Sequence, residues 1–197
     1  AVLESDLKDA TPGRALVHGC GAVGGTVARC LVEHGWTVFT VDLDRERAGF
    51  PGATPLPKSY PWWELKLDLL LPCSISGLIN AEMTAALRTP AIVPAANAPF
   101  QQPQLADDLR RRGVRVLPDP LVNAGAVIAD SIERFSPDAW KEAGAKDVYA
   151  FVREEVRQRA SDYLNQRDQG LSVGAALEEV AATPSTEPIG LSFGEST

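Results

Sequence analysis

The stretch LVHGCGAVGG, residues 16–25, constrains this chain more than any other. Gly19, Gly21 and Gly24 follow an apolar run and open a pattern of helical period, with the spacing G-x-G-x-x-G. Between a strand and a helix, the first glycine permits a tight turn, the second lets the backbone approach a diphosphate, and the third lets the helix pack closely. The first helical N–H groups would face the phosphates. The loop predicts a βαβ unit that binds a dinucleotide.

An acidic residue at the expected distance strengthens this interpretation. Asp42 closes the next β-type run, eighteen positions after Gly24, which is typical of a carboxylate that binds the ribose hydroxyls of adenosine. Because a carboxylate repels a 2′-phosphate, NAD is favoured over NADP as cofactor. Arg45 lies just past the acid, where a guanidinium could accept that phosphate. The alternative for the whole motif is a turn that packs tightly and binds nothing.

β-type runs alternate with helical patterns along the first two thirds of the chain, and several runs are apolar throughout, as in strands covered on both faces. This alternation predicts an α/β fold, with a doubly wound Rossmann-type parallel sheet and a C-terminal helical extension. The expected strands are 15–18, 37–41, 67–71, 91–94 and 115–117.

Three parts are expected along the chain. Residues 1–135 are predicted to form a Rossmann NAD-binding domain, 136–182 to form helices that pack on it, and 183–197 to be a mobile tail. Residues 49–61 contain four prolines and two glycines and are expected to form an irregular loop.

Composition excludes several classes of protein. A net charge of -7 and the lack of a basic stripe argue against nucleic-acid binding. No apolar run reaches the roughly 20 residues that cross a bilayer, so no membrane association is expected. The cysteines Cys20, Cys30 and Cys73 form no C-x-x-C pair, which favours neither a disulfide framework nor a metal site. We expect a cytoplasmic protein.

Three later segments, together with the glycine loop, resemble the cofactor domain of the glutamate/leucine/phenylalanine/valine dehydrogenase family. That family carries D-(I/L)-L-x-P-C-A, A-N-x-P and P-D-x-x-x-N-A-G-G-V in this order. The resemblance runs from about residue 6 to about residue 182. The segments are DLLLPCSISGLIN (68–80), AIVPAANAPF (91–100) and RVLPDPLVNAGAVIADSIERF (115–135).

The resemblance implies roles at the cofactor. Pro72, Cys73 and Ser74 would lie along the adenosine side of NAD, Asn97 would hydrogen-bond the nicotinamide riboside, and Asn123, opening a helix, would contact the nicotinamide end. Taken alone, each asparagine would be an N-cap or an Asx-turn. Two of them after successive strands favour the cofactor. The expected cofactor-binding residues are Gly19, Gly21, Ala22, Val23, Gly24, Asp42, Leu43, Pro72, Cys73, Ser74, Asn97 and Asn123.

Two departures from the family pattern matter. Ala126 replaces the second glycine of N-A-G-G. Its methyl group would be strained if that position has a positive φ, and would crowd the cofactor if that position touches it. Nothing before Leu16 resembles the family's substrate domain, whose glycine-rich segment carries a lysine. The catalytic residues are therefore unknown, since His18, His34 and Lys58 belong to no convincing constellation.

Two functions stay open. The first is an oxidoreductase, the NAD-binding half of an amino-acid dehydrogenase, which would carry out oxidative deamination by hydride transfer once a substrate domain completes it. The alternative is a noncatalytic NAD-binding module for regulation, assembly or sensing. Fold alone does not choose between them. In either case the acidic surface and the C-terminal helices predict a protein partner or a homo-oligomer.

Overall fold

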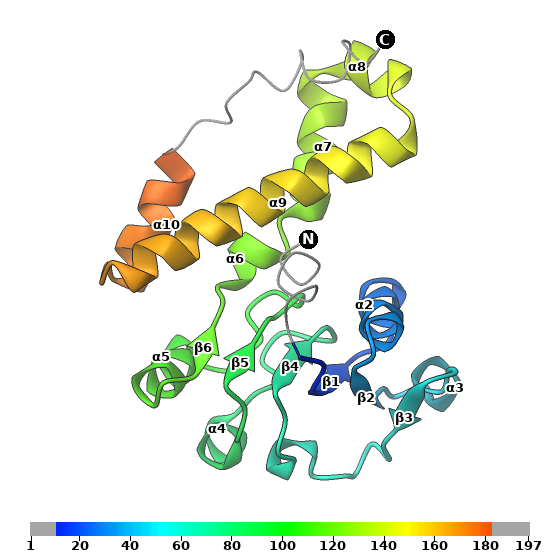
Figure 1. Cartoon of the computed structure of the whole chain (residues 1–197), viewed down its shortest axis with the longest axis vertical. Helices are drawn as coiled ribbons and strands as arrows, with labels where there is room; N and C mark the ends of the chain where they lie inside the picture. Colours follow the sequence, from blue (N-terminus) through cyan, green and yellow to red (C-terminus); the bar gives the residue numbers. More distant parts are fainter. Residues whose placement is uncertain (1–10, 183–197) are drawn as a thin grey trace. The chain divides into compact units, whose positions relative to one another are not determined.

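The computed structural model describes residues 11–182, which divide into an α/β unit that ends at Asn123 and a helical unit that begins at Ala124 (Figure 1). The α/β unit contains β1 (Arg14–His18), α2 (Ala22–Glu33), β2 (Thr37–Val41), α3 (Arg45–Ala48), β3 (Ala53–Pro55), the 3-10 helix η1 (Trp62–Glu64), β4 (Leu69–Pro72), α4 (Ala81–Ala86), β5 (Ala91–Ile92), α5 (Pro103–Arg111), β6 (Arg115–Val116) and α6 (Asp119–Val122). The helical unit contains α7 (Gly125–Phe135), α8 (Pro137–Glu142), α9 (Ala145–Asp168) and α10 (Val173–Ala182).

The α/β unit is built on one sheet of six parallel strands in the order β3-β2-β1-β4-β5-β6. On the central strand, Leu16 is in register with Phe39 on one side and Leu70 on the other. The strand order reverses between β1 and β4, so the crossovers run in opposite directions from this point. Figure 1 shows α2 on one face of the sheet and α4 on the other. The predicted doubly wound α/β fold is confirmed.

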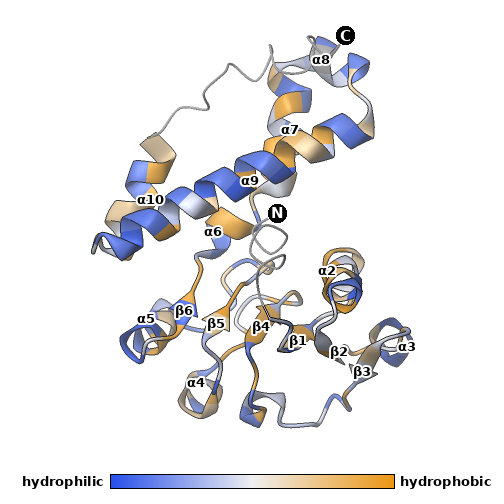
Figure 2. Ribbon diagram, viewed as in Figure 1, coloured by the Kyte–Doolittle hydropathy of each residue, from blue (hydrophilic) through white to orange (hydrophobic). Residues whose placement is uncertain are grey.

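Apolar strands position this sheet at the centre of its unit. All four residues of β4 are buried, as expected for a strand covered on both faces. In Figure 2, strands β4 and β5 are coloured as hydrophobic. A core cluster joins the sheet to α4, α5 and η1; it contains Leu16, Val41, Trp62, Leu67, Leu70, Ile79, Leu87, Ile92, Ala106, Leu109 and Val116.

The segment 49–61 is more ordered than the sequence predicts. Residues 53–55 form β3, which pairs with β2 and extends the sheet by one strand. The expectation of an irregular loop throughout is therefore wrong for this part. Pro55 is tolerated because β3 is an edge strand, where a residue without an N–H leaves no ladder bond unmade on the open side. The backbone returns to β2 just after it, where the N–H of Leu56 donates to the carbonyl of Thr40 at 2.8 Å.

The helical unit begins earlier than the predicted boundary at 135/136. Helix α7 packs on α9, and a Cβ at Gly125 would lie 3.2 Å from the side chain of Val152. Because α7 shares its packing with α9, the division falls at 123/124. The predicted tail, 183–197, lies outside the described residues.

Ala126 is not strained in the way its replacement of glycine suggested. It lies in α7 and is exposed, and among the described non-glycine residues only Ala98 has a positive φ. The condition for strain, a positive φ, is not met at this position, because the backbone there is helical.

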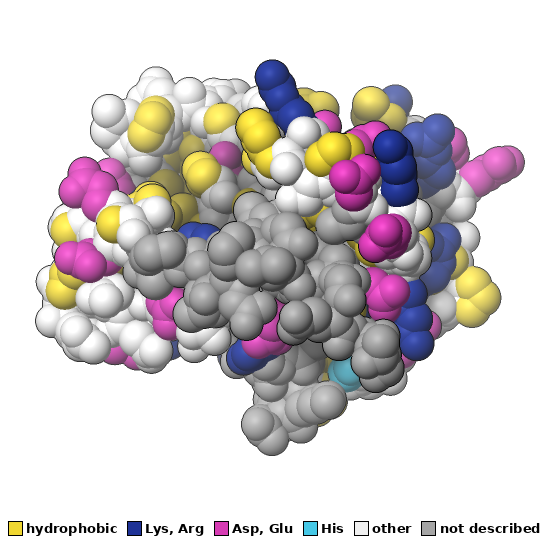
Figure 3. All heavy atoms as spheres, turned by 90° about the horizontal axis from the view of Figure 1, so that it is seen from above, with side chains coloured by type: hydrophobic (Ala, Val, Ile, Leu, Met, Phe, Trp, Pro, Cys, Tyr) yellow, Lys and Arg dark blue, Asp and Glu magenta, His cyan; other side chains and the backbone are white. Residues whose placement is uncertain are grey.

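The helical unit has its own buried stripe, formed in α9 by Val148, Val156, Ala160 and Tyr163 and in α10 by Ala176 and Val180. Figure 3 shows basic and acidic side chains interspersed with exposed hydrophobic ones on the face seen from above. None of the helices within residues 11–182 has the length and apolar character needed to span a membrane.

Candidate functional site

Packing in the glycine loop requires glycine at two of its three positions and leaves the third open. Gly19 has φ +96°, and a Cβ there would lie 2.7 Å from the Cα of Ser74. A Cβ at Gly24 would lie 1.8 Å from the carbonyl oxygen of Gly19, so any side chain would push α2 away from the loop. Gly21 differs, because its Cβ would meet nothing within 4 Å. The loop therefore packs tightly on the inside and leaves open space in front of the first turn of α2.

The carboxylate of Asp42 is hydrogen-bonded to this loop. One oxygen accepts the backbone N–H of Cys20 at 2.6 Å and the other accepts that of Asp44 at 2.8 Å. Desolvation by itself raises the pKa of Asp42. The two hydrogen bonds and the nearby charge of Arg47 outweigh it, so the pKa lies below its usual range. The residue is thus a fixed carboxylate beside the glycine loop.

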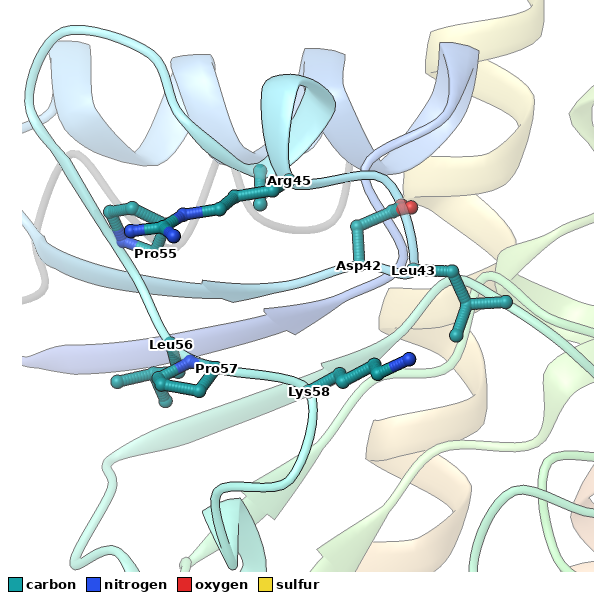
Figure 4. A pocket seen from close by; sticks show the side chains of 8 residues that line it. Asp42, Leu43, Arg45, Pro55, Leu56, Pro57 and Lys58 are labelled. Atoms are coloured by element: carbon teal, nitrogen blue, oxygen red, sulfur yellow. The ribbon is translucent and has the colours of Figure 1, made fainter.

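A pocket of about 340 Å³ opens beside Asp42 at the carboxyl ends of β2 and β3. In Figure 4 the Lys58 side chain points toward Leu43, while the Arg45 side chain points toward Pro55 and away from the carboxylate of Asp42. Leu43 is 91% exposed. The pocket is lined by Asp42, Leu43, Arg45, Ala48, Pro55, Leu56, Pro57 and Lys58.

The end of β4 lies against the glycine loop. Pro72 is the last residue of β4, and the N–H of Cys73 donates to the carbonyl of His18 at 2.7 Å. The hydroxyl of Ser74 is 2.9 Å from Nδ1 of His18. Burial raises the pKa of Cys20 to about 11 and that of Cys73 to about 12. Both thiols are therefore protonated at neutral pH and act as small packing groups rather than nucleophiles.

The two asparagines expected at the nicotinamide end lie in direct contact. Nδ2 of Asn123 donates to Oδ1 of Asn97 at 2.6 Å, although 26 positions separate them. Asn97 follows β5. Asn123 caps the C-terminal end of α6, its N–H donating to the carbonyl of Asp119 at 3.0 Å. The expectation that Asn123 opens a helix is wrong, because the single turn of α6 precedes it and α7 begins only at Gly125.

Three residues that sequence reasoning missed complete this cluster. The hydroxyl of Ser76 donates to the carbonyl of Asn97 at 2.7 Å, and the N–H of Ala98 donates to Oδ2 of Asp119 at 2.8 Å. Ala98 has φ +42°. The sequence signal for Asp119 was its place four residues before Asn123 in PDPLVNAG. Residues four apart lie on the same side of a helical turn. The signal for Ser76 and Ala98 was only their nearness to strand ends.

The other candidates do not gather into a catalytic group. Ala22 and Val23 are exposed at the start of α2, next to the open space. His34 binds the carbonyl of Cys30 at the far end of α2, at the opposite edge of the sheet. Burial lowers the pKa of His18, whose ring packs 5.2 Å from that of Trp62. No cluster of metal-binding side chains occurs within residues 11–182.

The six parallel strands in this order, with a glycine loop at the switch point, define a Rossmann-type α/β domain. The sequence profile of the Glutamate/Leucine/Phenylalanine/Valine dehydrogenase family matches residues 41–184. The chain therefore belongs to this family and contains a dehydrogenase-like domain.

Comparison with individual relatives supports this assignment to the family. Phenylalanine dehydrogenase from Lysinibacillus sphaericus is 27% identical over 157 residues, which cover 75% of this chain and 41% of that protein. The crystal structure of L-tryptophan dehydrogenase from Nostoc punctiforme has the same fold, with a TM-score of 0.76, 24% identity, and coverage of 91% of this chain and 55% of that one. Hetero-hexameric glutamate dehydrogenase from Thermus thermophilus gives a TM-score of 0.70 at 20% identity, with 91% and 49% coverage. The chain spans about half the length of these relatives.

Proposed function

We propose that this chain is the nucleotide-binding half of an amino-acid dehydrogenase and that it binds NAD along the carboxyl edge of its sheet. The observation that carries the proposal is the open space at Gly21, bounded by the start of α2 and the fixed carboxylate of Asp42. Unpaired N–H groups and the positive end of the helix dipole favour a diphosphate there.

The adenosine end of the cofactor fits the pocket beside Asp42. The pKa of Asp42 is lowered, so its carboxylate is charged at neutral pH and can accept hydrogen bonds from the ribose hydroxyls. Leu43, Leu56 and the prolines supply apolar surface for an adenine ring.

The nicotinamide end fits the cluster at Asn97 and Asn123. Because Oδ1 of Asn97 accepts from Asn123, the Nδ2 group of Asn97 is directed away from that bond and can donate to the riboside. When bound, NAD supplies the hydride acceptor. This chain's residues bind and orient it, and the groups that handle the amino acid are proposed to come from the half that the relatives have in addition.

We favour NAD because Asp42 would repel a 2′-phosphate. Arg45 and Lys58 line the same pocket and oppose that preference, but Figure 4 shows the Arg45 side chain turned away from Asp42. We also propose that the chain works in an oligomer, as the Thermus thermophilus relative is hetero-hexameric.

Calorimetric titration of the chain with NAD⁺ and NADP⁺ tests the proposal. Gly21→Ala places a methyl group in the space proposed for the diphosphate and is expected to weaken NAD⁺ binding at least about tenfold, since the backbone can no longer approach the phosphates. Gly174→Ala is the matched control, because its Cβ also meets nothing within 4 Å but lies in α10. It should leave binding unchanged.

No heat with either dinucleotide would refute the proposed binding, and tighter binding of NADP⁺ would refute the role given to Asp42. Catalysis is tested by amino-acid-dependent reduction of NAD⁺, with a panel of amino acids, on the chain alone and together with any protein that co-purifies. Binding without reduction in both preparations would favour the noncatalytic module.

A further inference from the structure

We propose that Asp119 is a positioning residue: its carboxylate holds the left-handed backbone of Ala98 and so fixes Asn97 in the orientation that meets the nicotinamide riboside. The inference rests on the proposed function, because it assigns a role toward the nicotinamide half of the same cofactor. It adds a residue that touches no cofactor itself and acts through its neighbour.

The single turn of α6 holds the Asn97–Ala98 segment from two sides. At its start, Oδ2 of Asp119 accepts the N–H of Ala98 at 2.8 Å. At its end, Nδ2 of Asn123 donates to Oδ1 of Asn97 at 2.6 Å. The N–H of Asn123 in turn donates to the carbonyl of Asp119 at 3.0 Å, which ties the two ends of the turn together.

The backbone held in this way is strained. Ala98 has φ +42°, in the left-handed region that alanine avoids because its Cβ crowds the neighbouring carbonyl oxygen. Such a conformation persists only where surrounding contacts enforce it. Here those contacts are the bond to Asp119 and the bond from the N–H of Gly77 to the carbonyl of Ala98 at 2.8 Å.

The strain matters for Asn97 because the two residues share a peptide unit. The N–H of Ala98 and the carbonyl of Asn97 belong to that unit, so Asp119 on one side and Ser76 on the other set its plane. If Asp119 is lost, Ala98 can relax to a negative φ, and the rotation turns the peptide and the preceding side chain. The adenosine pocket, formed by β2 and β3, would be left as it is.

The test compares NAD⁺ with ADP, which lacks the nicotinamide riboside, by titration of the full chain. Asp119→Ala is expected to weaken NAD⁺ binding about tenfold, the size of a lost hydrogen bond to a carboxylate, while the Kd for ADP stays within about twofold. Asp119→Asn keeps an acceptor oxygen and should bind NAD⁺ nearly as well as the unaltered chain. Ala98→Gly introduced into Asp119→Ala should restore most of the loss, because glycine adopts this φ without strain.

Asp68→Ala is the matched control. Asp68 likewise accepts a backbone N–H, that of Arg14 at 2.8 Å, but at the amino edge of the sheet, so its loss should affect NAD⁺ and ADP equally or not at all. Equal weakening of both ligands by Asp119→Ala, or no weakening, overturns the inference alone. Failure of the unaltered chain to bind either ligand overturns the proposed function as well. If Asp119→Ala does not fold, the double variant decides: a folded chain with restored preference for NAD⁺ supports the inference, and an unfolded or still weakened one refutes it.

Discussion

At the scale of single residues, Asp42 couples the proposed ligand site to stability. Both of its oxygens accept backbone N–H groups. Asparagine would keep one acceptor but turn an NH₂ group toward the second N–H. We expect Asp42→Asn to lower the free energy of unfolding at pH 7 by less than about 1 kcal/mol, because the carboxylate lies largely in water, which replaces most of the lost acceptor.

The pH dependence of this loss has a defined sign. The folded-state pKa of Asp42 lies below its unfolded value, so its stabilisation is fully present above about pH 4 and is lost as the pH falls through the folded pKa. Urea unfolding should therefore show a gap between the unaltered chain and Asp42→Asn at pH 7 that narrows below pH 4. A gap independent of pH would contradict the assignment. Asp138→Asn is the control, because that side chain is 94% exposed.

At the scale of elements, two arginines at the end of α5 donate to backbone carbonyls of neighbouring elements. Arg112 donates to the carbonyls of Thr84 and Leu87 at 2.6 and 3.0 Å, at the end of α4. These carbonyls have no partner within their own helix. Arg110 reaches back to the carbonyl of Val116 at 3.2 Å. Both side chains therefore have carbonyl partners on neighbouring elements.

We expect Arg112→Ala to lower the free energy of unfolding by about 1–3 kcal/mol, because two helix-end carbonyls lose a charged donor. Arg111→Ala is the matched control. Its side chain is 70% exposed and forms only a surface ion pair with Asp108, so its loss should cost less than about 1 kcal/mol. Urea denaturation of the two variants measures the difference, and equal losses would show that the bonds to α4 contribute little.

At the scale of the whole molecule, the two compact units predict more than one unfolding transition. Leu16 is fully buried in the α/β unit and Ile132 in the helical unit. Truncation of either to alanine should cost about 2–5 kcal/mol in its own unit. Scanning calorimetry should show Leu16→Ala and Ile132→Ala lowering different transitions, and NAD⁺ should raise only the one that Leu16→Ala lowers. A single transition lowered by both variants would refute independent unfolding.

Sequence reasoning reached the fold through features that depend on neighbours in the chain. Apolar runs predicted five of the strands and the parallel sheet. Sequence reasoning missed β3, because the prolines of that segment are typical of a loop. Pro55 is tolerated in a strand only because β3 lies at the edge of the sheet. The boundary between the units differs from the predicted one for a similar reason, since the packing of α7 on α9 is not visible in the pattern of α7.

The sequence by itself determined the glycine loop, the acid that closes β2, and the asparagines that follow β5 and β6, because each depends on residue type and local spacing. Only the tertiary structure decided what these groups bind to: Asp42 to the amide of Cys20, Asn97 to Asn123, and Ala98 to Asp119. Parallel strands bring their carboxyl ends to one edge, so residues far apart in sequence meet there. Their hydrogen bonds depend on the register of the strands and on backbone angles that no local pattern specifies.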